Sequence, residues 1–159
     1  MAALDDARKA QSFQVWAYCI MPNHVHVLVW PTQPEYRMDH ILIAIKKRAA
    51  VRCLAWLREY RPEVPPKLLV KEGKETRTRF WQEGPGYDRN LFRRKSIWDE
   101  IDYIHGNPVR AGLAECPTDW AWSSARWYEG LHPVEFEVDG CQVETPASMK
   151  GIWTMDLVD

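Results

Sequence analysis

The sequence predicts a single α+β domain in which an antiparallel pair of strands packs against two amphipathic helices. Two apolar, β-branched runs, 13–20 and 24–30, are separated by a Pro-Asn break that is typical of a tight turn. Between residues 38 and 60, apolar side chains recur every three or four positions, the period of a helix with one buried face. A second helix is expected from Ser96 onward.

Length and composition fit one soluble globular domain. The chain has 159 residues, of which 46% are hydrophobic and 27% are charged. It has no run of roughly 18 apolar residues, which a membrane span needs, and no secretory signal at its start. We therefore expect a cytoplasmic protein without a membrane partner. Its four cysteines are widely spaced, so we expect reduced cysteines that mostly serve packing.

The second run, 24–30, carries two histidines one residue apart. Side chains alternate along a strand, so His24 and His26 share one face and the neighbouring valines share the other. Two imidazoles on one face are able to bind a metal ion or a phosphate, although a structural role is the more common one. A (β/α)₈ amidohydrolase barrel would need roughly 250 residues. A histidine-triad hydrolase would need a third histidine where Leu28 stands, so both classes are excluded.

Other segments predict weaker elements. Residues 3–11 are weakly helical, 67–78 should form a loop or a weak hairpin, and 80–81 a short strand. Gly84-Pro85-Gly86 is a turn signal. The Asp-Gly pair within 136–143 predicts a type I′ hairpin, whereas roughly the last 15 residues show no clear pattern.

The second helix has recognisable start and stop signals. Ser96 and Asp99 have the spacing of a capping box, which places the start of the helix at Ser96. Gly106 and Pro108 should disturb its end, and Gly112 is the expected stop.

Tyr103 and Asn107 are four residues apart, so they share one face if the helix continues past Gly106. They would suit a nucleophile beside a metal ligand. They would equally suit a tyrosine that packs and an asparagine that caps the helix before Pro108. From the residues alone, this second interpretation is favoured.

Positive charge is concentrated in the middle of the chain. Between residues 46 and 95 there are 15 Lys and Arg against 6 Asp and Glu, whereas the rest carries 6 against 16. Such a block is either a solvated surface or a phosphate-binding face, and both interpretations stay open.

Several short motifs occur in a fixed order. They are Met21-Pro-Asn-His-Val-His26, Phe80-Trp81-Gln82, Tyr87-Asp88, Tyr103-Ile-His-Gly-Asn-Pro-Val-Arg-Ala-Gly-Leu113 and Trp122-Ser-Ser124. In combination, from about Val15 to Tyr128, the sequence resembles the REP-associated tyrosine transposases, relatives of the insertion-sequence single-tyrosine HUH transposases. The resemblance implies a ferredoxin-like antiparallel sheet with helices packed on it. We expect one such domain over 1–159, with a core at 13–128 and a C-terminal extension at 129–159.

The resemblance also implies an activity, namely metal-dependent cleavage and strand transfer of single-stranded DNA through a 5′-phosphotyrosine. Position by position, His24 and His26 would be metal ligands and Tyr103 the nucleophile. Asn107 would complete the metal site. The cofactor would be a divalent metal, Mg or Mn. The partner would be single-stranded DNA with hairpin structure at repetitive palindromic elements, and a dimer is allowed.

DNA contacts would come from the basic block and from exposed tryptophans. The candidate basic residues are Lys46, Lys47, Arg48 and Arg52 on the first long helix, and Arg89, Arg93 and Arg94 before the tyrosine helix. The tryptophans proposed to stack on bases are Trp30, Trp81 and Trp122.

The chain departs from the family pattern at its start. The family opens with a strand and a longer first helix, whereas this chain begins about where that helix ends. Because the first strand is central in a ferredoxin-like sheet, we expect it to be missing and the histidine strand to keep an unpaired edge, unless another segment such as 136–143 fills the place. A truncated, catalytically impaired remnant that binds single-stranded DNA is therefore the alternative function.

Overall fold

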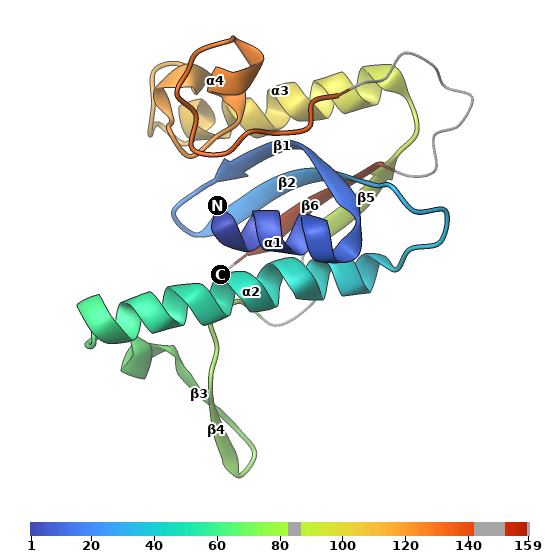
Figure 1. The fold of residues 1–159 in the computed structure, drawn as a ribbon. Helices are drawn as coiled ribbons and strands as arrows, with labels where there is room; N and C mark the ends of the chain where they lie inside the picture. The colour runs from blue at the N-terminus through green and yellow to red at the C-terminus, as the bar shows by residue number, and fades with distance from the viewer. Residues whose placement is uncertain (83–86, 142–151, 159) are drawn as a thin grey trace.

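A computed structural model describes residues 1–82, 87–141 and 152–158. A four-stranded antiparallel sheet lies between two helical layers (Figure 1). The strand order across the sheet is β1 (Phe13–Ile20), β2 (His24–Pro31), β6 (Ile152–Val158) and β5 (Tyr87–Leu91). Helices α1 (Ala2–Gln11) and α2 (Met38–Tyr60) cover one face, and α3 (Arg94–Arg110) and α4 (Ala125–Tyr128) lie on the other. The predicted α+β class with an antiparallel sheet is confirmed.

The alternation of side chains along β1 and β2 divides the interior into two hydrophobic clusters. Val27 and Val29 of β2 join the cluster under α1 and α2, where Ile41 is almost fully buried. Leu28 of β2 joins the cluster under α3 with Ile101. His24 and His26 have the parity of Leu28, so the histidine face of β2 is the α3 face.

Helix α3 differs from its prediction at both ends. It begins at Arg94, its N-cap is Arg93 and no side chain caps it, so the capping box predicted at Ser96 is wrong. The helix then continues through Gly106 and Pro108 to Arg110. The predicted stop is confirmed, because Gly112 has a φ of +68°, the left-handed conformation in which helices commonly end.

The segment after α2 forms a separate hairpin. A short 3-10 helix, η1 (Pro65–Leu68), leads into β3 (Leu69–Glu72) and β4 (Glu75–Thr78), which pair with each other. Phe80 and Trp81 form no strand, which corrects that prediction. Instead, the Trp81 indole N–H donates to the carbonyl of Lys46 at 2.9 Å, which fixes the segment against α2. The turn predicted at 84–86 lies outside the described residues.

Strand β6 is the largest departure from the sequence-based expectation. It pairs with β2 on one side and β5 on the other, so the histidine strand has no unpaired edge there. Its central position is the one expected of the missing first strand. The side chain of Met155, in the middle of β6, is fully buried in the cluster under α1 and α2.

The predicted 136–143 hairpin is wrong over 136–141, and residues 142 and 143 lie outside the described range. Asp139 binds the edge of β1 instead. Its N–H donates to the carbonyl of Val15, and its carboxylate accepts from the Val15 N–H, both at 2.8 Å. Phe136 and Val138, which precede Asp139 in the chain, enter the core under α1 and α2. The segment therefore covers the free edge of β1 without forming a strand pair.

All four cysteines are unbridged, as predicted. Only Cys19 is buried, and burial raises the pKa of its thiol to about 12. Cys53 and Cys116 are exposed, so the expectation that most cysteines serve packing is wrong. No helix among the described residues combines the length and hydropathy that crossing a bilayer requires.

Candidate active site

The two histidines of β2 face each other. Their Nε2 atoms are 2.9 Å apart, and their rings meet edge to face with centroids 4.7 Å apart. The Nδ1 of His24 lies 2.8 Å from the side-chain oxygen of Asn23. A carbonyl oxygen only accepts, so this contact places the His24 proton on Nδ1 and leaves a lone pair on Nε2. An imidazole held in this way by a second partner is the usual form of a metal-binding histidine.

The spacing of these nitrogens fits one divalent cation. Two nitrogens about 2.1 Å from an ion and at a right angle to each other lie about 3.0 Å apart. The Nε2 atoms of His24 and His26 have this spacing, and both must be unprotonated to bind the ion. Among the described residues, no group of three or more His, Cys, Asp or Glu side chains could hold a metal. Further ligands would thus be an amide oxygen, water or phosphate oxygens.

Tyr103 reaches the histidine pair from α3. Its ring meets the ring of His26 edge to face, with centroids 5.8 Å apart. His26 is 3% exposed, whereas Tyr103 is 46% exposed. The structure therefore brings His24, His26 and Tyr103 together at one point on the surface, with the phenol on its solvent side. A chain approaching from solvent would meet the phenol directly.

Asn107 lies one turn after Tyr103 and is largely buried. Its side-chain nitrogen donates to the carbonyls of Tyr103, at 3.1 Å, and Ile104, at 3.4 Å. The Ile104 carbonyl is the one that the N–H of residue 108 would bind, and Pro108 has no N–H. Asn107 thus supplies a donor to this carbonyl in place of the missing N–H. Its oxygen is the atom that remains for a metal, and its role as a ligand stays a prediction.

His105 fixes α3 to the sheet. Its Nε2 shares a hydrogen bond of 2.8 Å with the hydroxyl of Ser124, which also accepts from the Tyr18 N–H at 2.9 Å. Burial lowers the pKa of His105 to about 4, so this ring is neutral at physiological pH. The Trp-Ser-Ser motif therefore serves to hold the tyrosine helix against β1, and it contributes no group to the histidine site.

Arg110 is a site residue that the sequence reasoning missed. The carbon at the centre of its guanidinium lies 4.2 Å from the centroid of the Tyr103 ring. The same guanidinium donates to the Tyr103 carbonyl. The available signal was spacing, because residues seven apart lie two turns apart on one helix face.

The predicted basic residues occupy two different layers. Lys46, Lys47, Arg48 and Arg52 are on α2, on the sheet face opposite α3 (Figure 1). Arg52 pairs with Asp6 at 2.5 Å, and partial burial lowers the pKa of Lys46. Arg52 nevertheless lines a pocket together with His24, between the start of β2 and helices α1 and α2. Of these four α2 residues, Arg52 is the one that lines this pocket.

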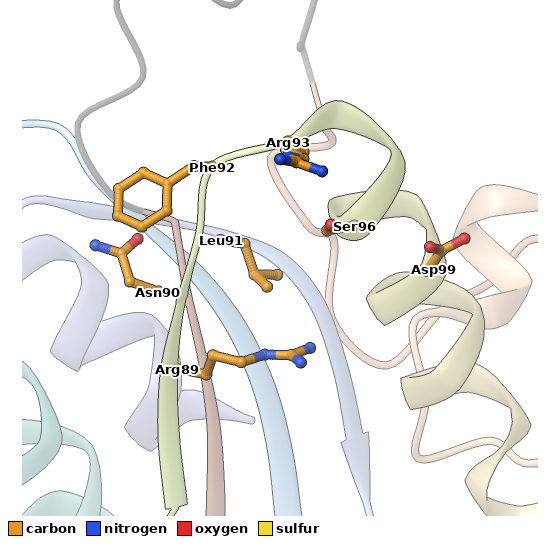
Figure 2. A pocket seen from close by; sticks show the side chains of 7 residues that line it. All are labelled: Arg89, Asn90, Leu91, Phe92, Arg93, Ser96 and Asp99. Atoms are coloured by element: carbon orange, nitrogen blue, oxygen red, sulfur yellow. The ribbon is translucent and has the colours of Figure 1, made fainter.

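Arg89 and Arg93 line a pocket where β5 leads into α3 (Figure 2). Arg89 points toward α3 and pairs with the buried Glu100 at 2.6 Å. Phe92 points to the other side of β5 and is 62% exposed. Within the described residues, Arg93 and its neighbour Arg94 take part in no ion pair, so both are available to an anion.

The three tryptophans proposed to stack on bases have different environments. Trp30 packs edge to face on Trp16 with centroids 4.9 Å apart, and Trp81 is anchored by its indole N–H. Trp122 is 48% exposed. Trp122 is therefore the one of the three with an open face, and Phe92 is an exposed ring that the sequence reasoning did not single out.

Comparisons with known proteins identify similar proteins by sequence and by fold. No protein-family model matches the chain. A curated protein of Haemophilus influenzae named as a REP-associated tyrosine transposase is 32% identical over 114 residues, which cover 70% of this chain and 58% of that protein. A solved REP-associated tyrosine transposase bound to a REP hairpin superposes with a TM-score of 0.54 at 18% identity, covering 94% of this chain and 78% of that one. The matched part of this chain thus spans little more than half the length of its curated relative. The chain is therefore similar in sequence to one REP-associated tyrosine transposase and has the fold of another.

Proposed function

We propose that this protein cleaves and rejoins single-stranded DNA, with Tyr103 as the nucleophile. The observation that supports the proposal is that His26 lies between His24 and Tyr103 on the α3 face, with Tyr103 exposed to solvent. The DNA class follows from the relative that was solved with a REP hairpin. We therefore propose hairpin-forming, repetitive palindromic DNA as the substrate.

A Mg or Mn ion at His24 and His26, with Asn107 as a further ligand, would polarise the scissile phosphate and offset its charge. The chain supplies the remaining chemistry. The Tyr103 oxygen attacks phosphorus, the phenol proton passes to solvent, and a bond from Tyr103 to phosphorus forms. The bond from phosphorus to O3′ breaks, and O3′ takes up a proton.

The products are a 5′-phosphotyrosine and a free 3′-OH. One phosphodiester replaces another, so a second 3′-OH can attack the adduct and rejoin the strand without a nucleotide cofactor. His26 lies against the Tyr103 ring, which limits the positions that the phenol can adopt. The half-exposed phenol is consistent with attack on an incoming strand.

We further propose that the DNA extends from Tyr103 along α3 toward the pocket at the β5–α3 junction. Arg93 and Arg94 would contact phosphates there, and Phe92 would stack on a base. Arg89 would have to share its guanidinium between a phosphate and Glu100. The α2 residues lie on the other layer, and through Arg52 they would meet only DNA that passes the start of β2.

The test is a covalent adduct assay. The protein is incubated with a labelled single-stranded palindrome and Mn²⁺, and the products are separated on a denaturing gel. We expect a protein–DNA band that disappears with EDTA, in Tyr103→Phe and in the double variant His24→Ala/His26→Ala. Tyr60→Phe is the matched control, because Tyr60 is an exposed tyrosine of α2 and should leave the band unchanged.

Two results would count against the proposal. An adduct that persists in Tyr103→Phe would assign the nucleophile to another residue. Binding of the hairpin with no adduct under any metal condition would favour the other candidate class, a single-strand DNA-binding module that has lost catalysis. Anisotropy with the same labelled DNA measures that binding directly.

A further inference from the structure

Arg110 lies folded back along α3 so that its guanidinium covers the ring of Tyr103. The guanidinium carbon is 4.2 Å from the ring centroid, and one terminal nitrogen donates to the Tyr103 carbonyl. This position requires the side chain to cross Gly106. A Cβ built on Gly106 would lie 2.7 Å from a terminal nitrogen of Arg110, so the guanidinium, the end of a flexible side chain, would have to move.

The glycine therefore has a physical explanation. Glycine costs up to about 1 kcal/mol relative to alanine inside a helix, and α3 carries it one turn before Arg110. No positive φ requires it, since Gly106 is not among the glycines with that conformation. The absence of a Cβ at Gly106 leaves the space through which the Arg110 side chain reaches the Tyr103 ring.

The charge of Arg110 is placed where a phosphate would arrive. A phosphorus atom positioned for attack lies about 3–3.5 Å from the phenol oxygen, at the edge of the ring that the guanidinium covers. Arginine has five N–H donors, and the Tyr103 carbonyl is the one acceptor that the described residues give it. The remaining donors are in the planar arrangement that suits two phosphate oxygens.

We propose that Arg110 binds the scissile phosphate beside Tyr103, and that Gly106 is a positioning residue that lets Arg110 do so. The inference rests on the proposed function and adds a phosphate-binding residue to its site. A purely structural role for Arg110, such as satisfying carbonyls near the end of α3, is the competing explanation. The two explanations make different predictions. If Arg110 binds the scissile phosphate, its effect on affinity depends on the charge of that one phosphate; if its role is structural, it does not.

Binding measurements separate the two explanations. In a Tyr103→Phe background, which keeps a ring under Arg110 and prevents turnover, anisotropy with Mn²⁺ gives the affinity for the palindrome. A single uncharged methylphosphonate is then moved along the strand one phosphate at a time. With Arg110 present, we expect one position at which the loss of charge weakens binding strongly. With Arg110→Gln, the penalty at that position should shrink about tenfold.

Arg58→Gln is the matched control, because it removes one exposed arginine from α2 and should leave the pattern along the strand unchanged. An equal effect of Arg110→Gln at every methylphosphonate position would assign Arg110 a structural role and overturn the inference. No measurable effect at any position would overturn it as well. Where wild-type protein forms an adduct, the responding phosphate should be the one that is cleaved.

Gly106→Ala gives an independent test in the adduct assay. Alanine favours the helix, so the free energy of unfolding should stay the same or rise, while the adduct forms about 10²-fold more slowly because Arg110 is displaced. Combining Gly106→Ala with Arg110→Gln should add little further loss. Losses that multiply in full, or a Gly106→Ala protein with unchanged rate, would contradict the positioning role. A chain without any adduct in the wild type would reject the proposed function, and the binding cycle would still decide the role of Arg110.

Discussion

Met155→Ala tests whether the central strand β6 supports the sheet that carries the histidines. Met155 is fully buried, and in the strand register it lies opposite Val27 of β2. Removing its side chain loses about 1.5–3 kcal/mol of burial free energy and leaves a cavity that surrounding residues fill only in part. Substitutions of this kind cost about 2–5 kcal/mol, so we expect about 3 kcal/mol.

Urea denaturation followed by tryptophan fluorescence measures this loss as a change in the free energy of unfolding. For a domain of this size, about 3 kcal/mol corresponds to a fall in Tm of about 6–12 °C. Ile43→Ala is the matched control, because Ile43 is 58% exposed on α2 and its truncation should change stability by no more than about 0.5 kcal/mol.

The double variant with Val27→Ala sharpens the test. Val27 and Met155 belong to one cluster, so their losses should not simply add. A Met155→Ala protein as stable as the Ile43→Ala control would show that β6 does not pack between β2 and β5. In that case the histidine strand would have the unpaired edge expected from the family comparison.

Three further predictions follow from single contacts. Burial lowers the pKa of His105 from about 6.5 in the unfolded chain to about 4 in the folded protein. Between these two pH values the unfolded chain binds more protons than the folded protein, so stability falls as the pH is lowered. Urea titrations should show about 2 kcal/mol lost between pH 7 and pH 4.5, and His105→Gln should remove that part of the dependence. Asp139→Ala should cost about 1 kcal/mol in the same assay, because Val15 at the edge of β1 loses an acceptor, and an unchanged midpoint would be inconsistent with that contact. Phe92→Ala should weaken hairpin binding about tenfold in anisotropy without changing stability, since its ring is exposed, and equal affinity would exclude it from the DNA path.

Local sequence patterns were sufficient to predict the strands and the helix that position the histidines. The bounds predicted for β1 and α2 are those observed, and β2 ends one residue later than expected. Alternation along β2 also predicted correctly that His24 and His26 share a face. These predictions succeed because strand alternation, helix period and turn chemistry depend on neighbours in sequence.

The features that were missed depend on distant partners. β6 is a short apolar strand whose place is fixed by pairing with β2 and β5, and no local signal reveals that pairing. The charge count could not show that α2 and α3 lie on opposite faces of the sheet, which separates the two basic groups. Arg110 was overlooked because its importance comes from the space above Gly106, a three-dimensional property of the helix surface.

The position of β6 also determines the order in which the protein can fold. β1 and β2 are neighbours in sequence and can pair early, with α1 and α2 close behind. β5 reaches β2 only through β6, which the ribosome makes after both, whereas the tyrosine helix packs on β1 and β2 directly. Until that strand is synthesised and inserted, β5 lacks the strand it pairs with and β2 is paired with β1 alone. A nascent chain can therefore bring its tyrosine helix against the histidine strand before the sheet is complete.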